Sequence, residues 1–258
     1  MSKIGLSMLY SLGEPFHKMI ERLPKSEMAY VEIVDDGLHA LDSQRVTILK
    51  SIRDSYDLKY SVHAPFADIN IASTSNQMLD AMLKRLDESM INAQALDAYM
   101  WVFHPGIRSG ISSFYPGMDW LQNQKTVKTL LRMAENCGLK IAIENVPEPY
   151  PFLMKSVDDF SKFFNEIGED IGIVLDIGHS NINGQTELFL ETFTDKIVHM
   201  HLSDNNGEAD QHLGIGYGTV NWKRITDMIK ETSYKGVAVI EAIEHVKESA
   251  QRLKHFLG

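Results

Sequence analysis

Short, nearly continuous apolar runs recur along the whole chain and are separated by longer segments with helical spacing. Each run is rich in β-branched residues and is bounded by loop residues, a pattern typical of strands buried on both faces of a parallel sheet. The predicted strands cover residues 4–8, 30–34, 60–63, 100–104, 140–144, 172–176, 197–201 and 236–241. We therefore expect one parallel sheet of eight strands.

The segments between these runs repeat apolar residues at intervals of three and four, which predicts amphipathic helices. They include residues 78–96, 127–137, 157–164, 222–229 and 246–256. Strands that alternate with helix-length connections favour an α/β fold, the (β/α)8 TIM barrel of typically about 250 residues, over a doubly wound open sheet. No linker, charge block or low-complexity stretch divides the chain, so we expect residues 1–258 to form a single domain.

Side chains of the types that bind divalent metals stand at the ends of the predicted strands or in the loops that follow. Buried imidazoles and carboxylates are costly unless they are paired or bound to a cation. In a (β/α)8 barrel the carboxyl ends of the strands meet at one rim, where catalysis takes place. The pattern predicts a metalloenzyme with these candidate site residues: His63, His104, Glu144, Asp176, His179, His201, Asp210, His212 and Glu241.

Two histidines on the seventh predicted strand have the same parity. Because side chains alternate across a strand, His199 and His201 should both point inward, with His201 nearer the rim. We expect His201 to bind the metal and His199 to be a core histidine or a support for the ligands.

These residues lie in motifs that resemble the xylose isomerase-like barrel superfamily, and the resemblance covers nearly the whole chain in order. The superfamily includes sugar and sugar-phosphate isomerases and epimerases, dehydratases and the endonuclease IV class of apurinic-site nucleases. The motifs are Val62-His63-Ala64-Pro65-Phe66, Phe103-His104-Pro105-Gly106, Ile143-Glu144-Asn145, Leu175-Asp176-Ile177-Gly178-His179, His199-Met200-His201-Leu202-Ser203-Asp204-Asn205 and Asp210-Gln211-His212-Leu213-Gly214.

The resemblance implies a divalent-metal-dependent isomerase or epimerase of a small sugar, a sugar phosphate or a related ketone. In such enzymes one metal ion per chain (Mn²⁺, Mg²⁺, Co²⁺ or Zn²⁺) acidifies a C–H bond and holds a cis-enediolate. Glu144 and Glu241 would act as the catalytic acid/base pair as well as metal ligands. The implied metal ligands are Glu144, Asp176, His201 and Glu241, and the implied substrate-binding residues are His63, His104, His179, Asp210 and His212.

The main alternative is an endonuclease IV-like apurinic-site phosphodiesterase that holds three zinc ions. Its two additional metals would be bound by His63 with His104, and by His179, Asp210 and His212. A metal-dependent sugar dehydratase, which expels a β-hydroxyl from the same enediolate, is a third reading.

Three departures from the nuclease pattern favour a small ligand. The loop after the third strand contains Pro65, residues 146–151 are proline-rich and stiff, and the first strand reads Gly5-Leu6-Ser7 where the nuclease has a histidine.

Two loops are candidate covers for the site, residues 148–152 and 214–218, because glycines permit movement and Tyr150, Phe152 and Tyr217 could exclude water. The alternative for residues 214–218 is an ordinary strand-to-helix loop that does not cover the site.

Four further charged residues lie close to the motifs. Asp35 and Asp36 end the second strand, where they either contact substrate hydroxyls or are exposed loop acids, and Arg108 and Lys155 are candidate phosphate contacts.

Composition agrees with a single soluble domain in the cytoplasm. The formal charge of −10 is not typical of a general phosphate-backbone binder, so nucleic acid is a partner only in the nuclease reading. The single cysteine, Cys137, excludes an internal disulfide and suits a reducing compartment. No apolar run approaches the roughly 18 residues of a membrane helix. Members of the superfamily often dimerise, and the outer helices would offer surface for a homodimer.

Overall fold

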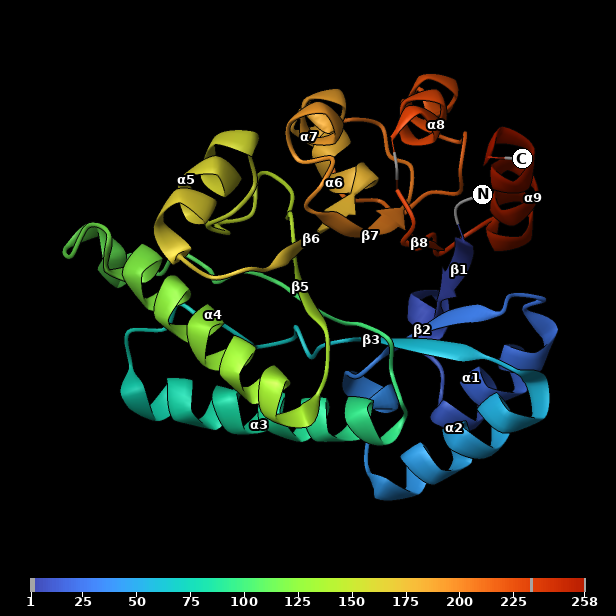
Figure 1. The fold of residues 1–258 in the computed structure, drawn as a ribbon, viewed down its shortest axis with the longest axis horizontal. Helices are drawn as coiled ribbons and strands as arrows, with labels where there is room; N and C mark the ends of the chain where they lie inside the picture. Colours follow the sequence, from blue (N-terminus) through green and yellow to red (C-terminus); the bar gives the residue numbers. More distant parts are fainter. Residues whose placement is uncertain (1–2, 233, 258) are drawn as a thin grey trace.

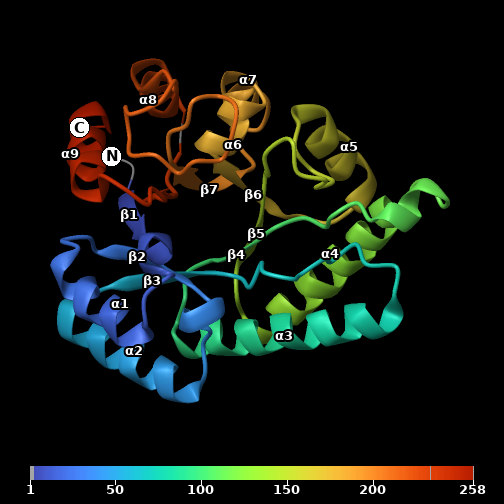
Figure 2. The ribbon, with the colours of Figure 1, turned by 180° about the vertical axis from the view of Figure 1, so that it is seen from behind.

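The computed structural model describes residues 3–232 and 234–257, which form a closed barrel of parallel strands inside a ring of helices (Figures 1 and 2). The strands pair in sequence order, and β8 closes the barrel against β1. They are β1 (Lys3–Ser7), β2 (Tyr30–Val34), β3 (Lys59–His63), β4 (Trp101–Phe103), β5 (Ile141–Glu144), β6 (Gly172–Asp176), β7 (Ile197–Leu202) and β8 (Val237–Ile240). The predicted (β/α)8 barrel is confirmed.

The helices cover the outside of the barrel, and two short ones share the connection between β6 and β7. They are α1 (Phe16–Arg22), α2 (Ser43–Tyr56), α3 (Asn76–Ala95), α4 (Met118–Cys137), α5 (Val157–Ile167), α6 (Ile177–Ile182), α7 (Thr186–Thr192), α8 (Trp222–Glu231) and α9 (Val246–Leu257). Within the described residues, no helix combines the length and apolarity needed to cross a membrane.

Helix α4 differs most from its prediction, because it begins at Met118 and not at residue 127. The face of its first turns that packs inward is polar, with Asp119, Asn123 and Thr126 all buried, so apolar spacing gives no signal there. Asn123 Oδ1 accepts the Gly106 N–H at 2.7 Å. The polar face therefore anchors the loop that follows β4.

The barrel interior is polar on one side and apolar on the other. Glu32 on β2 lies within hydrogen-bond distance of Ser61 on β3 and of His199 on β7, which faces it across the barrel. A small apolar cluster occupies the strands β4 to β6 and is separate from the main core between strands and helices; its members are Met100, Val102, Ala142 and Val174.

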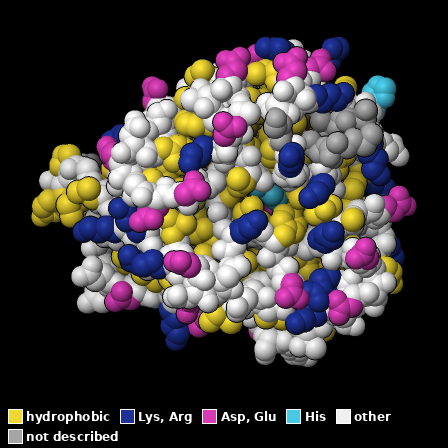
Figure 3. Space-filling view, in the orientation of Figure 1, with side chains coloured by type: hydrophobic (Ala, Val, Ile, Leu, Met, Phe, Trp, Pro, Cys, Tyr) yellow, Lys and Arg dark blue, Asp and Glu magenta, His cyan; other side chains and the backbone are white. Residues whose placement is uncertain are grey.

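The end of the barrel where the strands begin has a basic character. A cavity there is lined by Lys3, Lys59, Lys140 and Lys235, and Figure 3 shows lysine and arginine side chains grouped around a hollow on one face of the molecule. None of the metal-ligand groups found among the described residues lies at this end. The nine predicted site residues lie toward the opposite rim, and one further group that could hold a metal ion, Glu32, His199 and His201, is fully buried inside the barrel.

Candidate metal centre

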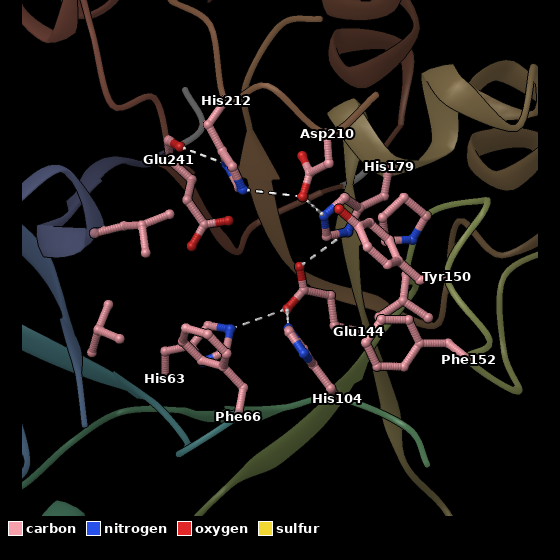
Figure 4. A pocket seen from close by; sticks show the side chains of 14 residues that line it. His63, Phe66, His104, Glu144, Tyr150, Phe152, His179, Asp210, His212 and Glu241 are labelled. Atoms are coloured by element: carbon pink, nitrogen blue, oxygen red, sulfur yellow. Dashed lines mark hydrogen bonds and ion pairs between the residues drawn. The ribbon is translucent and has the colours of Figure 1, made fainter. Parts of the chain in front are cut away.

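A cavity of about 340 Å³ opens at the carboxyl ends of the strands, and it contains most of the predicted site residues (Figure 4). Its polar lining consists of His63, His104, Glu144, His179, Asp210, His212 and Glu241. Its apolar walls include Phe66, Pro147, Tyr150 and Phe152. Asp176 and His201 do not line the cavity, and both side chains are fully buried.

Four of these residues converge on one point. Each of Glu144, Asp176, His201 and Glu241 offers a ligand atom, and these atoms all lie within 4.8 Å of one another. The His201 Nδ1 atom is 3.0 Å from Glu144 Oε1 and 3.2 Å from Glu241 Oε2. The strand ends of β5, β6 and β8 supply the three carboxylates, and β7 supplies the imidazole. This is the set that the resemblance to the superfamily implies as metal ligands.

The electrostatics of this group fit a divalent cation. Burial, with the negative charges of Glu144 and Glu241, raises the pKa of Asp176 to about 7 against the opposing charge of His179. Glu144 Oε2 and Asp176 Oδ2 are buried and have no hydrogen-bond partner among the described residues. Three buried carboxylates around one imidazole form a hard, oxygen-rich donor set that a divalent metal would neutralise.

A second group surrounds the other side of Glu144. The Nε2 atoms of His63 and His104 lie 3.4 Å and 3.3 Å from Glu144 Oε2. His63 Nδ1 donates to the Ala64 carbonyl at 2.9 Å, which leaves Nε2 directed at the carboxylate. Burial opposes protonation of His63, but the adjacent Glu144 carboxylate outweighs burial and raises the pKa of His63 to about 9. At His104 burial prevails, and the pKa is lowered.

A third group lies beside the first and is centred on Asp210. The Nε2 atoms of His179 and His212 both lie 3.2 Å from Asp210 Oδ2. Burial raises the pKa of Asp210, but the hydrogen bonds of the two histidines outweigh it and hold that pKa well below its usual range. Asp176 Oδ1 accepts the His179 N–H at 2.6 Å and so fixes the first turn of α6. The structure thus brings all nine predicted site residues together. They form four groups that could each hold a metal ion: Glu144, Asp176, His201 and Glu241; His63, His104 and Glu144; His63, His201 and Glu241; and His179, Asp210 and His212.

The comparisons with known proteins agree with this geometry. Residues 20–256 match the family described as xylose isomerase-like TIM barrel. The chain belongs to this family. Among solved structures, a "D-tagatose 3-epimerase-like protein" superposes with a TM-score of 0.92 and is 31% identical, with 99% of this chain and 97% of that chain covered.

The curated relatives differ in what their names state. The uncharacterized protein MJ1311 of Methanocaldococcus jannaschii is 32% identical over 99% of this chain and 89% of its own length. A D-psicose 3-epimerase of Enterocloster bolteae is 25% identical over 51% of this chain and 46% of its length. A probable endonuclease 4 of Thermoplasma volcanium is 21% identical over 72% of each. Both the isomerase and the nuclease readings therefore have relatives within the family.

One residue that contacts this centre was not predicted from the sequence. Glu32 is fully buried in the middle of β2, and its Oε1 lies 3.0 Å from His201 Nε2. The available signal was a single carboxylate inside an otherwise apolar strand, at the parity that points into the barrel.

The other charged candidates lie outside the cavity. Asp35 is buried, not exposed, and pairs with Arg85 at 2.6 Å, while Asp36 accepts the backbone N–H groups of Phe66 and Ala67 at 2.9 Å and 2.8 Å. Both acids therefore serve the loops after β2 and β3.

The two basic candidates for phosphate binding are also engaged elsewhere. Lys155 pairs with Glu148 at 2.6 Å, and Arg108 lies 3.5 Å from Asp119. Neither side chain lines the cavity.

Only one of the two predicted covers reaches the site. Tyr150 and Phe152 line the cavity, and the Phe152 ring meets the His104 ring edge to face at 5.9 Å. Tyr217 does not line the cavity, because its ring stacks on His245 at 4.0 Å. In this structure Tyr217 therefore does not cover the cavity, and residues 214–218 form a loop between β7 and α8.

Proposed function

We propose that this protein is a divalent-metal-dependent isomerase or epimerase of a small sugar, a sugar phosphate or a related ketone. The observation that carries the proposal is the pair of carboxylates, Glu144 and Glu241, that enter one small cavity from different strand ends (Figure 4). Both lie within 3.2 Å of the same His201 nitrogen, so a single cation could contact both. A cavity of about 340 Å³ suits a sugar-sized molecule.

The residues of the cavity divide the chemical work. A divalent cation held by Glu144, Asp176, His201 and Glu241 would polarise adjacent substrate oxygens and acidify the C–H bond between them. One glutamate then takes the proton from carbon, and the other returns a proton to the resulting cis-enediolate. In an epimerase, the returned proton is added to the opposite face of the same carbon.

The remaining polar side chains orient the substrate and exclude water. His179 and His212 line the cavity, and their Nε2 atoms would contact substrate hydroxyls by exchanging their contacts with Asp210. Phe66, Tyr150 and Phe152 shield the reacting carbons from solvent, which strengthens the electrostatic interactions within the site.

The comparisons support sugar chemistry over the other readings. The similar solved structure is described as D-tagatose 3-epimerase-like, and a curated relative is a D-psicose 3-epimerase. Dehydration through the same enediolate differs only in the loss of a β-hydroxyl, and the formation of an alkene product would reveal it.

A trinuclear phosphodiesterase is the second candidate, and two observations favour it. First, His63 and His104 form a group with Glu144 that could hold a metal ion. Second, His179 and His212 form another such group with Asp210. Against it stand the aromatic walls of a small cavity and the charge of −10. With saturating zinc, failure to nick duplex DNA at an abasic site would reject this candidate.

The proposal is tested by exchange of a carbon-bound proton with solvent. The Mn²⁺-loaded protein is incubated with D-psicose or D-tagatose in D₂O, and deuterium at carbon is followed by NMR. Wild type should incorporate deuterium into a true substrate, whereas Glu144→Gln and Glu241→Gln should abolish incorporation because each removes one proton-transferring carboxylate. Glu187→Gln, which alters an acid on α7 paired with Arg224 outside the cavity, is the matched control. Unchanged exchange in both cavity variants would refute the mechanism.

A further inference from the structure

Glu32 is a carboxylate held entirely by polar groups inside the barrel. It is fully buried in β2, and no Lys or Arg among the described residues pairs with it. Ser61 Oγ donates to Glu32 Oε2 at 3.0 Å, and His199 Nε2 lies 3.1 Å from the same oxygen. The other oxygen, Oε1, lies 3.0 Å from His201 Nε2, an ion-pair contact that lacks hydrogen-bond geometry, because neither atom has a hydrogen-bond partner among the described residues. One carboxylate oxygen is thus anchored to the barrel, and the other faces the histidine of the metal centre.

The two ring nitrogens of His201 face different partners. Nδ1 is directed at Glu144 and Glu241, and Nε2 is directed at Glu32 on the opposite side of the ring. A neutral imidazole carries its proton on one nitrogen and offers a lone pair on the other. A carboxylate beside Nε2 holds the proton there and leaves the Nδ1 lone pair toward the ligand cluster. Carboxylates that accept the second N–H of a metal-binding histidine orient its ring and raise its basicity.

We propose that Glu32 is a positioning residue that fixes the orientation and tautomer of His201, so that Nδ1 is the metal-binding atom. The inference rests on the proposed metal centre and adds to it a residue that does not touch the metal. It also gives the inward-facing His199 a function, because His199 secures the oxygen of Glu32 that does not face His201.

A chain of hydrogen bonds holds Glu32 from below. Tyr99 Oη donates to Ser61 Oγ at 3.2 Å, and Ser61 Oγ donates to Glu32 at 3.0 Å. Tyr99 lines the basic cavity at the far end of the barrel. A connected column of polar side chains therefore ends at the metal centre. It consists of Tyr99, which precedes β4, Ser61 on β3, Glu32 on β2 and His199 on β7.

The chain offers a matched control for the loss of a buried carboxylate. Asp35 follows β2 directly, is also fully buried, and pairs with Arg85 on α3 away from the cavity. Asp35→Asn should cost stability without changing the metal centre. Glu32→Gln keeps the shape of the side chain and removes the charge that favours a proton on His201 Nε2.

The first measurement is zinc affinity, by competition with a chelator, for wild type, Glu32→Gln and Asp35→Asn. We expect Glu32→Gln to weaken zinc binding by about 10- to 100-fold and Asp35→Asn to bind as wild type does. Equal affinity in wild type and Glu32→Gln would overturn the inference while leaving the metal centre intact. Absence of zinc binding by wild type would instead overturn the metal centre and the inference with it.

The second measurement uses no Glu32 variant, so it can be made even if Glu32→Gln does not fold. In zinc-loaded wild type, long-range ¹H–¹⁵N NMR should show the His201 proton on Nε2, with the signal assigned by its loss in His201→Asn. A proton on Nδ1 would overturn the proposal, because Nε2 would then be the metal-binding nitrogen.

Discussion

Asp176 shows at the scale of a single residue why this centre calls for a cation. It is fully buried, one of its oxygens has no hydrogen-bond partner among the described residues, and burial beside two other acids raises its pKa to about 7. A carboxylate in such surroundings destabilises the metal-free protein and binds a divalent cation strongly when one is present.

Asp176→Asn should therefore separate folding from metal binding. Without metal, we expect the variant to unfold at the same temperature as wild type or higher, because it removes a buried like charge. With Mn²⁺ at about 100 times its dissociation constant, wild type should gain about 2.7 kcal/mol in unfolding free energy, and the variant should gain almost none.

The measurement is thermal unfolding with and without Mn²⁺. Asp119→Asn, which alters a buried acid on α4 away from the cavity, should keep the full metal-dependent gain. An Asp176→Asn protein with the same gain as wild type would show that Asp176 is not a ligand.

The candidate ligands could be predicted from sequence because each follows an apolar run, and parallel strands bring such positions to one rim. Glu32 lies within a run, where apolar neighbours conceal it, and its partners come from strands distant in sequence. Its contact with His201 depends on the closure of the barrel, which strand patterns alone do not reveal.

At the scale of elements, the loop after β4 links the metal centre to its cover. Gly106 lies two residues after His104, its N–H donates to Asn123 on α4 at 2.7 Å, and its carbonyl accepts the Leu153 N–H at 3.0 Å. A Cβ atom at Gly106 would overlap the Cβ of Ala72 and would lie 2.7 Å from the Ala72 backbone nitrogen. The close approach of two backbones requires glycine here.

Gly106→Ala should reduce the unfolding free energy by roughly 1–3 kcal/mol, because backbone must shift to admit the methyl group. Gly110→Ala is the matched control, since a Cβ atom there meets nothing within 4 Å. Urea denaturation measures both, and equal stability of the two variants would contradict the packing described for this loop.

Element boundaries were predictable only where the buried face is apolar. The strands agree with prediction to within about two residues at each end, whereas the start of α4 was missed because its buried face is polar. Likewise, the placement of Tyr217 against His245 depends on the segment between β8 and α9 and could not be derived from the glycine-rich loop alone.

At the scale of the molecule, the alternation of strand and helix patterns was sufficient to predict the barrel, and the resemblance to a family was sufficient to predict the rim that carries the chemistry. The number of metal ions could not be derived in this way. The same nine residues form one group of four ligands and three further groups of three, and the isomerase and nuclease readings differ in which groups bind metal.

The most direct test is to count and locate the metal ions in protein purified without chelator, by elemental analysis and anomalous diffraction. We expect one divalent metal per chain, bound by Glu144, Asp176, His201 and Glu241. Three metals that also engage His63, His104, His179, Asp210 and His212 would contradict the isomerase proposal in favour of phosphodiester hydrolysis, and a protein without metal would contradict both.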